Sequence, residues 1–279
     1  MHTIRKIAMI MTSILLLLGG WIVFNREIRP LHYQILFPYS ILHGKPLALT
    51  ETRMGGDGRL QVRVPAGTAK LGKDETAAEI DVPEYWIDQT PVTLAAFKQY
   101  IEKTGALAPR YHDEYAKFWK EKRYELLPAV FVSWGQAEEY CEYYGGHLPT
   151  EAQWEKAARG PEGVILYWND AEKAFHKANY DRFYKDKTPS GWLPAGKTVY
   201  GVLDMAGNVR EWCLEWLPDL KGPIYTGSWK DMAEMKMKDT GRLLKGGGFN
   251  DDVSHLRFFS RDVHDPFSPG LNRGFRCVY

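Results

Sequence analysis

An uncharged stretch near the start of the chain constrains the fold more than any other sequence feature. Residues 7–24 (IAMIMTSILLLLGGWIVF) carry no charge, and only Thr12 and Ser13 add polar side chains. As a helix rising about 1.5 Å per residue, the stretch is roughly 27 Å long, enough to cross the hydrocarbon core of a membrane. A buried helix of a globular domain would normally show a polar stripe. The sequence therefore predicts a transmembrane helix over 7–24, with any folded domain after it.

This segment has two competing interpretations, a cleaved signal peptide and an uncleaved signal-anchor. Its apolar run is longer than usual for a signal peptide, and no small-residue cleavage pattern follows it. No cysteine follows Gly19-Gly20 to accept a lipid. We therefore expect an anchor in the inner (cytoplasmic) membrane, with residues 1–6 in the cytoplasm and the C-terminal domain in the periplasm or another extracytoplasmic space. Basic residues lie on both sides of the stretch, so charge gives little orientation signal.

A connector and one folded body are expected after the anchor. Residues 25–59 contain aromatic residues, prolines and glycines without a clear period, which predicts a juxtamembrane connector. From residue 60 the pattern changes, and 60–64 (LQVRV) and 84–88 (EYWID) predict short strands. No internal repeat is visible, so we expect residues 60–279 to form one domain.

Three helices are predicted inside this body. Each begins after a hydroxyl-bearing N-cap residue, Thr93, Ser133 or Thr150, and continues with apolar residues at helical spacing. Each also ends at glycine. Gln153 follows Thr150 by three residues, which is the arrangement of a capping box.

Beyond residue 160 the helical periodicity fades. Glycine, asparagine, aspartate and tryptophan dominate, with short predicted strands at 242–244 and 274–279. We therefore expect an α+β domain with little regular secondary structure, in which loops carry much of the fold. The 36 basic and 35 acidic residues give a net charge of +1, which argues against a protein that binds nucleic acid through a basic face. No G-x-S-x-G, H-E-x-x-H or phosphate-loop motif is present to indicate an ordinary hydrolase or nucleotide-binding enzyme.

The body resembles the formylglycine-generating enzyme, or sulfatase-modifying factor, family from about Val62 to Tyr279. Several long motifs carry the resemblance in the family's order: VRVPAGTAKLG at 62–72, YWIDQTPVT at 85–93, PAVFVSWGQAEEYCEYYGGHLPTEAQWEKAARG at 128–160, YGVLDMAGNVREW at 200–212, LLKGGGFND at 243–251 and NRGFRCVY at 272–279. The resemblance implies a variant of the C-type lectin fold.

The resemblance also implies a structural calcium site within the segment DMAGNVRE. The family's ligands match the side chains of Asp204 and Glu211 and the main-chain oxygens of Gly207 and Val209. Mixed carboxylate and carbonyl oxygens suit Ca²⁺, which takes six to eight ligands in loose geometry. On residue chemistry alone, these side chains could instead cap a turn before the next strand.

A second calcium site of the family would begin at Asn179 and the carbonyl of Tyr180. Its other half falls in a divergent stretch, residues 181–188, where Asp181 or Asp186 could supply a carboxylate. Either ion would be structural, because it would hold loops that have little secondary structure of their own.

The chain has three cysteines. Some members of the family join the positions that match Cys141 and Cys277, so the resemblance implies a disulfide suited to an oxidising compartment. In the chain-entropy model such a bridge contributes roughly 4–5 kcal/mol. The alternative is two buried thiols that act as small apolar residues. Cys213 is expected to be a buried apolar residue and not a nucleophile.

The family's active site is where this chain departs from the pattern. The enzyme that makes formylglycine binds copper through two cysteines five residues apart. Aligned on 245–250 (KGGGFN), those positions are Asp251 and Leu256, the preceding serine is Gly248, and a pocket tryptophan is Arg210. Copper(I) requires soft thiolate ligands, which neither a carboxylate nor a leucine replaces. We therefore expect no copper, and no oxidation of peptidyl cysteine by the family's copper mechanism.

Other polar residues gather around the same position. A carboxylate close to an imidazole can transfer protons or bind a metal. An Asn-Asp-Asp turn can equally well cap loops and pair with neighbouring arginines, and we prefer this structural interpretation for any single residue. The pocket candidates are Arg210, Asn250, Asp251, Asp252, His255 and Arg257, followed by His264 and Asp265.

Iron-dependent chemistry like that of the related sulfoxide synthases is disfavoured. Those proteins use an additional helical domain with an H-x₃-H-x-E motif, and this chain offers only His112 in a plausible helical region.

Two classes of function remain. The first is a membrane-tethered binding or accessory module that recognises a protein, peptide, glycan or small molecule outside the cytoplasm. The second is an atypical periplasmic maturation enzyme that oxidises or tautomerises a secreted metabolite, as the family member of pyoverdine siderophore maturation does. An enzyme should bring Asp251, His255 and Arg210 together on a deep cleft, whereas a binding module should fill that space with aromatic side chains. We favour the binding module.

Overall fold

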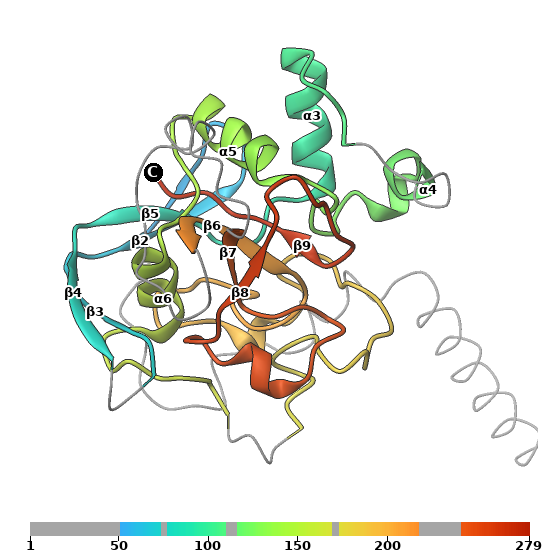
Figure 1. The fold of residues 1–279 in the computed structure, drawn as a ribbon. Helices are drawn as coiled ribbons and strands as arrows, with labels where there is room; N and C mark the ends of the chain where they lie inside the picture. The colour runs from blue at the N-terminus through green and yellow to red at the C-terminus, as the bar shows by residue number, and fades with distance from the viewer. Residues whose placement is uncertain (1–50, 74–76, 110–115, 169–172, 218–240) are drawn as a thin grey trace, which may run out of the picture. The chain divides into compact units, whose positions relative to one another are not determined.

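The computed structural model describes residues 51–73, 77–109, 116–168, 173–217 and 241–279 (Figure 1). Two compact units are present, 1–46 and 47–279, and every described residue belongs to the second. The expected anchor (7–24), most of the expected connector and His112 lie outside the described residues. Within the described ranges, no helix combines the length and apolar character needed to span a membrane.

The first sheet contains β1 (Thr52–Met54), β2 (Leu60–Val64) and β5 (Tyr85–Asp88), antiparallel in the order β1-β2-β5. β3 (Gly67–Leu71) and β4 (Ala78–Val82) form a separate hairpin. Strand pairing therefore begins at residue 52, inside the stretch expected to be connector. All three residues of β1 are exposed, so that strand has no apolar alternation by which the sequence could reveal it.

The second sheet carries the glycine-rich motifs. Its order is β8-β7-β6-β9, with β9 parallel to β6 and the other pairs antiparallel. The strands are β6 (Arg210–Leu217), β7 (Gly241–Lys245), β8 (Asp262–His264) and β9 (Arg273–Gly274).

The predicted strand at 274–279 is wrong as a single element. β9 ends at Gly274, and the last residues pair elsewhere: Val278 bridges both Ile87 and His147, and Tyr279 exchanges backbone hydrogen bonds with Trp86. The chain leaves the second sheet after two residues because its end completes the hydrogen bonds of β5. Sequence alternation could not reveal this change of partner.

The three predicted helices are confirmed as α3 (Leu94–Thr104), α5 (Trp134–Tyr143) and α6 (Glu151–Arg159). The capping hydroxyls of Thr93, Ser133 and Thr150 accept backbone hydrogen bonds, and the latter two form capping boxes. The structure adds one short helix and three 3₁₀ turns: α4 (Ala116–Lys120), η5 (Lys122–Tyr124), η6 (Pro194–Gly196) and η7 (Val253–Leu256).

Two apolar clusters cover opposite faces of the second sheet. Leu243 and Cys213 pack in one cluster with Trp154 of α6. Leu244 and Trp212 pack in the other with residues of α5. Successive strand residues point to opposite faces, so α6 covers one face and α5 the other. Figure 1 shows α6 between the β3–β4 hairpin and this sheet.

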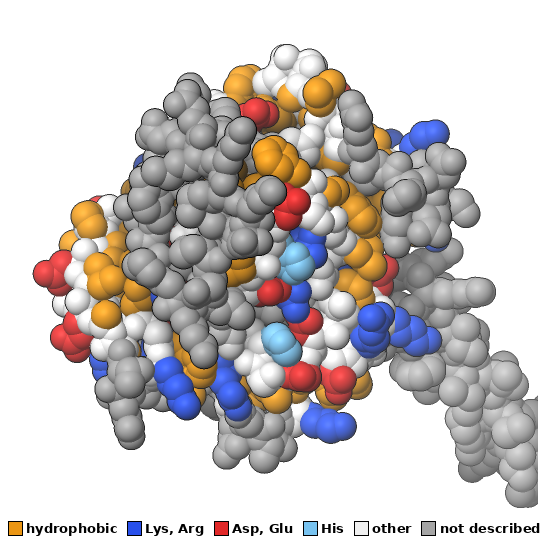
Figure 2. Space-filling model, in the orientation of Figure 1, with side chains coloured by type: hydrophobic (Ala, Val, Ile, Leu, Met, Phe, Trp, Pro, Cys, Tyr) orange, Lys and Arg blue, Asp and Glu red, His pale blue; other side chains and the backbone are white. Residues whose placement is uncertain are grey.

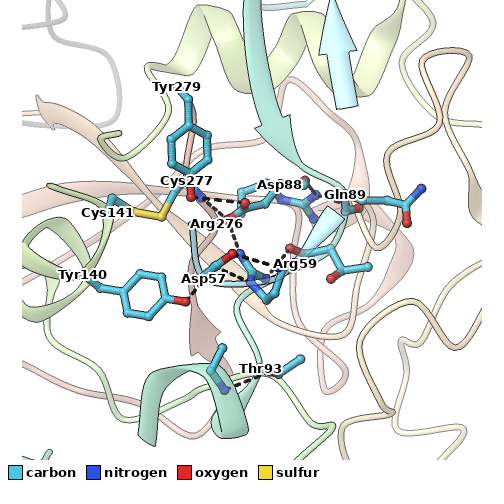
Figure 3. Close-up of polar contacts among 12 residues, drawn as sticks. Asp57, Arg59, Asp88, Gln89, Thr93, Tyr140, Cys141, Arg276, Cys277 and Tyr279 are labelled. Carbon is cyan, nitrogen blue, oxygen red and sulfur yellow. Dashed lines mark hydrogen bonds and ion pairs between the residues drawn. A yellow bond between two sulfur atoms is a disulfide. The ribbon is translucent and has the colours of Figure 1, made fainter. Parts of the chain in front are cut away.

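The disulfide implied by the resemblance is present and joins Cys141 of α5 to Cys277 (Figure 3). Beside it, Asp88 is fully buried and accepts a hydrogen bond from the Cys277 N–H at 2.9 Å. Arg59 joins Asp88 to Asp57, which lies in the stretch expected to be connector. The C-terminal segment is therefore held covalently and by buried charges. Cys213 is free and buried, as expected.

Candidate functional site

A small recess opens at the end of the second sheet, where the glycine-rich turn follows β7. It has about 10 Å³ of space for water, which is room for one water molecule. Its lining residues are Arg210, Leu244, Gly246, Gly247, His255, Ser260, Arg261 and Asp262. In the described part of the chain, the recess is therefore a small hollow and not the deep cleft expected of an enzyme, and none of its lining residues is an aromatic side chain of the kind expected of a binding module.

Arg210, the first residue of β6, is held from two sides. Its Nη2 lies 2.7 Å from Asp251 Oδ1, and its Nη1 lies 2.6 Å from Asp262 Oδ2. The other oxygen of Asp251 accepts the backbone N–H of Gly248 at 2.6 Å. The Arg210 side chain is 15% exposed and that of Asp251 10%, so the ion pair is well shielded from water. Part of the space in the recess is thus filled by an internal salt bridge.

Beneath the glycines lies a buried charge network. Lys245 Nζ is 3.1 Å from Glu151 Oε1 and 2.8 Å from Glu155 Oε1, both on α6. Arg261, in the wall of the recess, binds both oxygens of Glu151 at 2.7 Å. Burial alone would raise the pKa of Glu151, but Lys245 and Arg261 hold it below its ordinary value. This network fixes α6 against β7 and forms a rigid base for the recess.

The remaining pocket candidates do not converge on one point. Asp252 caps η7 and lies 3.3 Å from His255 Nδ1, and both side chains are more than half exposed. Asn250 accepts a hydrogen bond from Asn272 instead. Of the carboxylates named from sequence, only Asp251 meets Arg210, whereas His255 reaches the recess from the solvent side.

Sequence reasoning missed Asp262, Arg261 and Arg273. Asp262 is the second partner of Arg210, and Arg273 Nη2 lies 3.2 Å from Nε2 of His264. Burial would raise the pKa of Asp262, but hydrogen bonding to His264 and the charge of Arg210 hold it below its usual range. The available signal was the polar alternation of Asp262 and His264 along a short strand.

Asp251 and Leu256, which we expect to occupy the positions of the family's copper-binding cysteines, have other roles in this structure. Asp251 forms an ion pair with Arg210 and accepts a hydrogen bond from the Gly248 N–H. Leu256 is fully buried in the apolar cluster that contains Trp154. Neither position presents a soft ligand to the recess.

The expected calcium segment forms a tight loop before β6. Asp204, Gly207 and Asn208 all have left-handed φ angles of 58°, 78° and 66°. Glu211 is fully buried, and Arg276 binds both its oxygens, at 2.6 and 2.7 Å. Burial raises the pKa of Asp204 to about 6, and the nearby charge of Glu211 adds to the shift.

The expected second calcium segment lies directly against this loop. Asn179 is 1% exposed, its carbonyl accepts the N–H of Asn208, and its side-chain Oδ1 is buried without a hydrogen-bond partner. Gly207 approaches so closely that a Cβ there would lie 2.3 Å from the Asn179 carbonyl oxygen. Tyr180 is buried and stacks on Trp168. Neither Asp181 nor Asp186 is buried beside Asn179, and among the described residues no three His, Cys, Asp or Glu side chains form a metal-binding group.

Figure 2 shows the face around β7 and β8, where histidine, acidic and basic side chains lie close together, bordered by hydrophobic side chains. Contacts among Arg210, Asp262, His264 and Arg273 connect β6, β8 and β9, and we call these four residues the polar strip.

Comparison with known proteins shows what the chain is similar to. The model of the sulfatase-modifying factor enzyme 1-like domain matches residues 48–279. The serine/threonine-protein kinase pkn1 of Chlamydia caviae is 32% identical over 214 residues, which cover 72% of this chain but 34% of the kinase. The chain thus spans about a third of that relative's length. The formylglycine-generating enzyme of Mus musculus is 25% identical over 305 residues, covering 84% of this chain and 76% of the enzyme.

Among solved structures, PvdO from Pseudomonas aeruginosa superimposes with a TM-score of 0.62 at 23% identity, covering 85% of this chain and 99% of that structure. This likeness supports the expected α+β fold. The match over residues 48–279 shows that the chain belongs to the sulfatase-modifying factor enzyme 1-like family.

Proposed function

We propose that this protein is a membrane-tethered, extracytoplasmic binding or accessory module and not a copper-dependent formylglycine-generating oxidase. The observation that carries the proposal is the Arg210 ion pair. Where the oxidase needs a thiolate, this chain has Asp251, and both ends of the Arg210 guanidinium are bound to carboxylates. A soft metal has no sulfur ligand in the recess, and a deep substrate cleft is not formed by its lining residues.

The chemistry of the recess favours recognition of a polar group. Arg210, Arg261, His255 and Ser260 line the hollow, and Asp262 adds a carboxylate. These side chains already have partners inside the protein, such as Glu151 for Arg261 and the Ser254 carbonyl for Ser260. A polar ligand group would bind there by exchanging with such partners.

A maturation enzyme is the second candidate. The observation in its favour is that His255 and Ser260 line the same recess as Arg210 and Asp262, so a proton acceptor and a hydroxyl are available there. Such an enzyme would act on a small secreted metabolite without copper.

The first prediction concerns oxidase activity. Purified full-length protein, loaded with copper(I) and supplied with oxygen and a cysteine-bearing sulfatase peptide, should give no aldehyde by mass spectrometry, because Asp251 and Leu256 cannot bind the metal. A thiol-containing formylglycine-generating enzyme run in parallel checks the assay.

The binding role needs its own readout. A photo-crosslinker at His255 should capture a reproducible adduct in intact cells, whereas the same crosslinker at Glu79, exposed on β4, should not. Aldehyde formation in the first assay, or identical adducts from both positions in the second, would contradict the binding module.

We further propose a structural Ca²⁺ held by Asp204, Glu211 and the carbonyls of Gly207 and Val209. The charge of the loop supports such an ion, which would have to share the oxygens of Glu211 with Arg276. Asp204 and Glu211 are buried carboxylates with one guanidinium, that of Arg276, beside them, so the loop retains an excess of negative charge. The unpartnered Oδ1 of Asn179 supports an ion in the adjoining segment with the carbonyl of Tyr180. The ion would neutralise the loop and fix its left-handed backbone.

The second prediction tests this ion. Metal analysis of purified protein should find calcium, and a chelator should lower the melting temperature, because an ion that binds only the folded state at 100 times its Kd adds about 2.7 kcal/mol of stability. Asp204→Asn should abolish the chelator effect. Asp252→Asn, which changes an exposed carboxylate, should keep it. Equal melting temperatures with calcium and with chelator would rule the site out.

A further inference from the structure

The ring Nε2 of His264 lies between a hydrogen-bond donor, Arg273, and a hydrogen-bond acceptor, Asp262. His264 is the last residue of β8, and its Nε2 lies 3.2 Å from Arg273 Nη2 and 3.5 Å from Asp262 Oδ2. The guanidinium can only donate a hydrogen bond, and the carboxylate can only accept one. Nε2 therefore satisfies Arg273 when it carries no proton and Asp262 when it carries one.

The same Asp262 oxygen also holds Arg210. Arg210 Nη1 lies 2.6 Å from Asp262 Oδ2, closer than His264 does at 3.5 Å. A proton on His264 adds a positive charge beside this oxygen and turns the ring nitrogen from an acceptor into a charge-assisted donor. Arg210 then competes with His264 for one carboxylate.

From this juxtaposition we propose that His264 is a proton-dependent switch for the recess: neutral, it accepts from Arg273 and leaves Asp262 to Arg210; protonated, it binds Asp262 and loosens Arg210. The proposal rests on the recess being the binding site of the proposed function. It deepens that function by making the availability of Arg210 depend on pH.

Charged groups from three other strands or loops surround the imidazole. Arg273 of β9 and Arg242 of β7, whose Cα is the cross-strand partner of His264, oppose a second positive charge. Asp262, two residues earlier on the same strand, favours it. Arg210 of β6 lies beyond Asp262. Asp265 follows His264 in the chain and caps the next turn through the Phe267 N–H.

Protonation should change what the recess offers a ligand. Arg210 would keep Asp251 through Nη2, while Nη1 would become free to donate. Because Arg210 lines the recess, the freed N–H would favour a ligand that presents a hydrogen-bond acceptor, such as a carboxylate or a carbonyl. The third prediction is therefore tighter binding of acceptor groups at mildly acidic pH.

The direct test observes Arg210 in the full-length protein without any ligand. In an NMR titration from pH 8 to pH 5, with arginine and histidine side chains isotope-labelled, the Arg210 Nε–H signal should shift with the same midpoint as the His264 ring. In His264→Asn, whose amide does not titrate, that shift should be lost. In His255→Asn it should remain, because His255 lines the same recess but pairs with exposed Asp252.

Each result of this titration either supports or overturns the switch. An Arg210 signal that stays fixed while His264 titrates overturns the switch, and this needs only the native protein even if a variant fails to fold. A shift that persists in His264→Asn also overturns it. The NMR titration uses no ligand, so it tests the switch separately from the binding function. If Arg210 and His264 shift together but no adduct forms at His255, the switch is supported and only the binding function is rejected.

Discussion

Buried charges are paired differently on the two faces of the second sheet. On the face covered by α6, Lys245 contacts two carboxylates and Arg276 binds both oxygens of Glu211. On the face covered by α5, Arg242 lies between the indole rings of Trp134 and Trp216, 3.5 and 4.3 Å from their centroids. Its Nη1 donates to the Leu214 carbonyl, whereas its Nε and Nη2 are buried without hydrogen-bond partners in a residue that is 1% exposed.

This difference separates a scaffold from an adjustable site. A buried charge that is fully paired resists change, since moving either partner leaves the other uncompensated. Groups that are incompletely paired, such as Arg273 with its unpartnered Nε, can exchange partners at smaller cost. The polar strip belongs to this second face, because Asp262 and His264 are the cross-strand partners of Leu244 and Arg242. The family's glycine-rich recess thus sits where a rigid face and a loosely paired face meet.

The largest expected effect comes from breaking the α6 face. Lys245→Met leaves Glu151 and Glu155 buried without their shared ammonium, and breaking a buried ion pair in this way typically costs about 3–5 kcal/mol. Urea unfolding of the full-length protein, followed by tryptophan fluorescence, measures the loss.

Arg242→Met is the matched control on the α5 face. It removes two unpartnered nitrogens together with the hydrogen bond from Nη1 to the Leu214 carbonyl and the indole contacts, each worth about 2 kcal/mol when desolvated. We expect its loss to be smaller than that of Lys245→Met, because no buried charge is left without its partner. Equal losses of unfolding free energy in the two variants would contradict the proposed difference between the two faces.

A smaller effect should appear in the pH dependence of stability. Burial raises the pKa of Glu138 and that of Glu215 to about 7, against a backbone hydrogen bond to each. Between the unfolded pKa near 4.5 and this value, the folded state keeps protons that the unfolded state has released. Stability should therefore fall as pH rises from about 5 to 8, by about 1–3 kcal/mol per carboxyl.

Glu215→Gln sharpens this test because it keeps the shape and removes the titration. Its stability should depend less on pH across this window than that of the native protein, whereas Glu139→Gln, exposed on the same helix as Glu138, should follow the native curve. If the free energy of unfolding of the native protein rose with pH over this range, these carboxyls would be ionised in the folded state at no cost in stability.

Much of the local structure could be predicted from the sequence. Thr93, Ser133 and Thr150 begin helices as expected because an N-cap hydroxyl satisfies backbone N–H groups within three residues, and such a signal is local. The family and the Cys141–Cys277 pairing followed from motifs matched in order, and the disulfide is present.

The candidate site was predicted less well. Arg210 and Asp251 were both named, but their pairing was not, and Asp262 was missed entirely. These contacts join residues 41 and 52 positions apart, and they depend on the register between strands as well as on residue type. The exposed β1 escaped because it shows no apolar alternation. The division of the C-terminal segment escaped because the sequence of a strand does not show which partners it pairs with.

By itself, the sequence determined where helices begin, which family the chain joins and that no thiolate pair stands at the glycine-rich turn. Only the tertiary structure decided which charges meet, which stay buried without a partner, and that His264 faces a donor and an acceptor at once. The physical reason is range: capping and chemical identity act within a few residues, whereas the pairing of charges is fixed by packing between segments that the chain brings together only on folding.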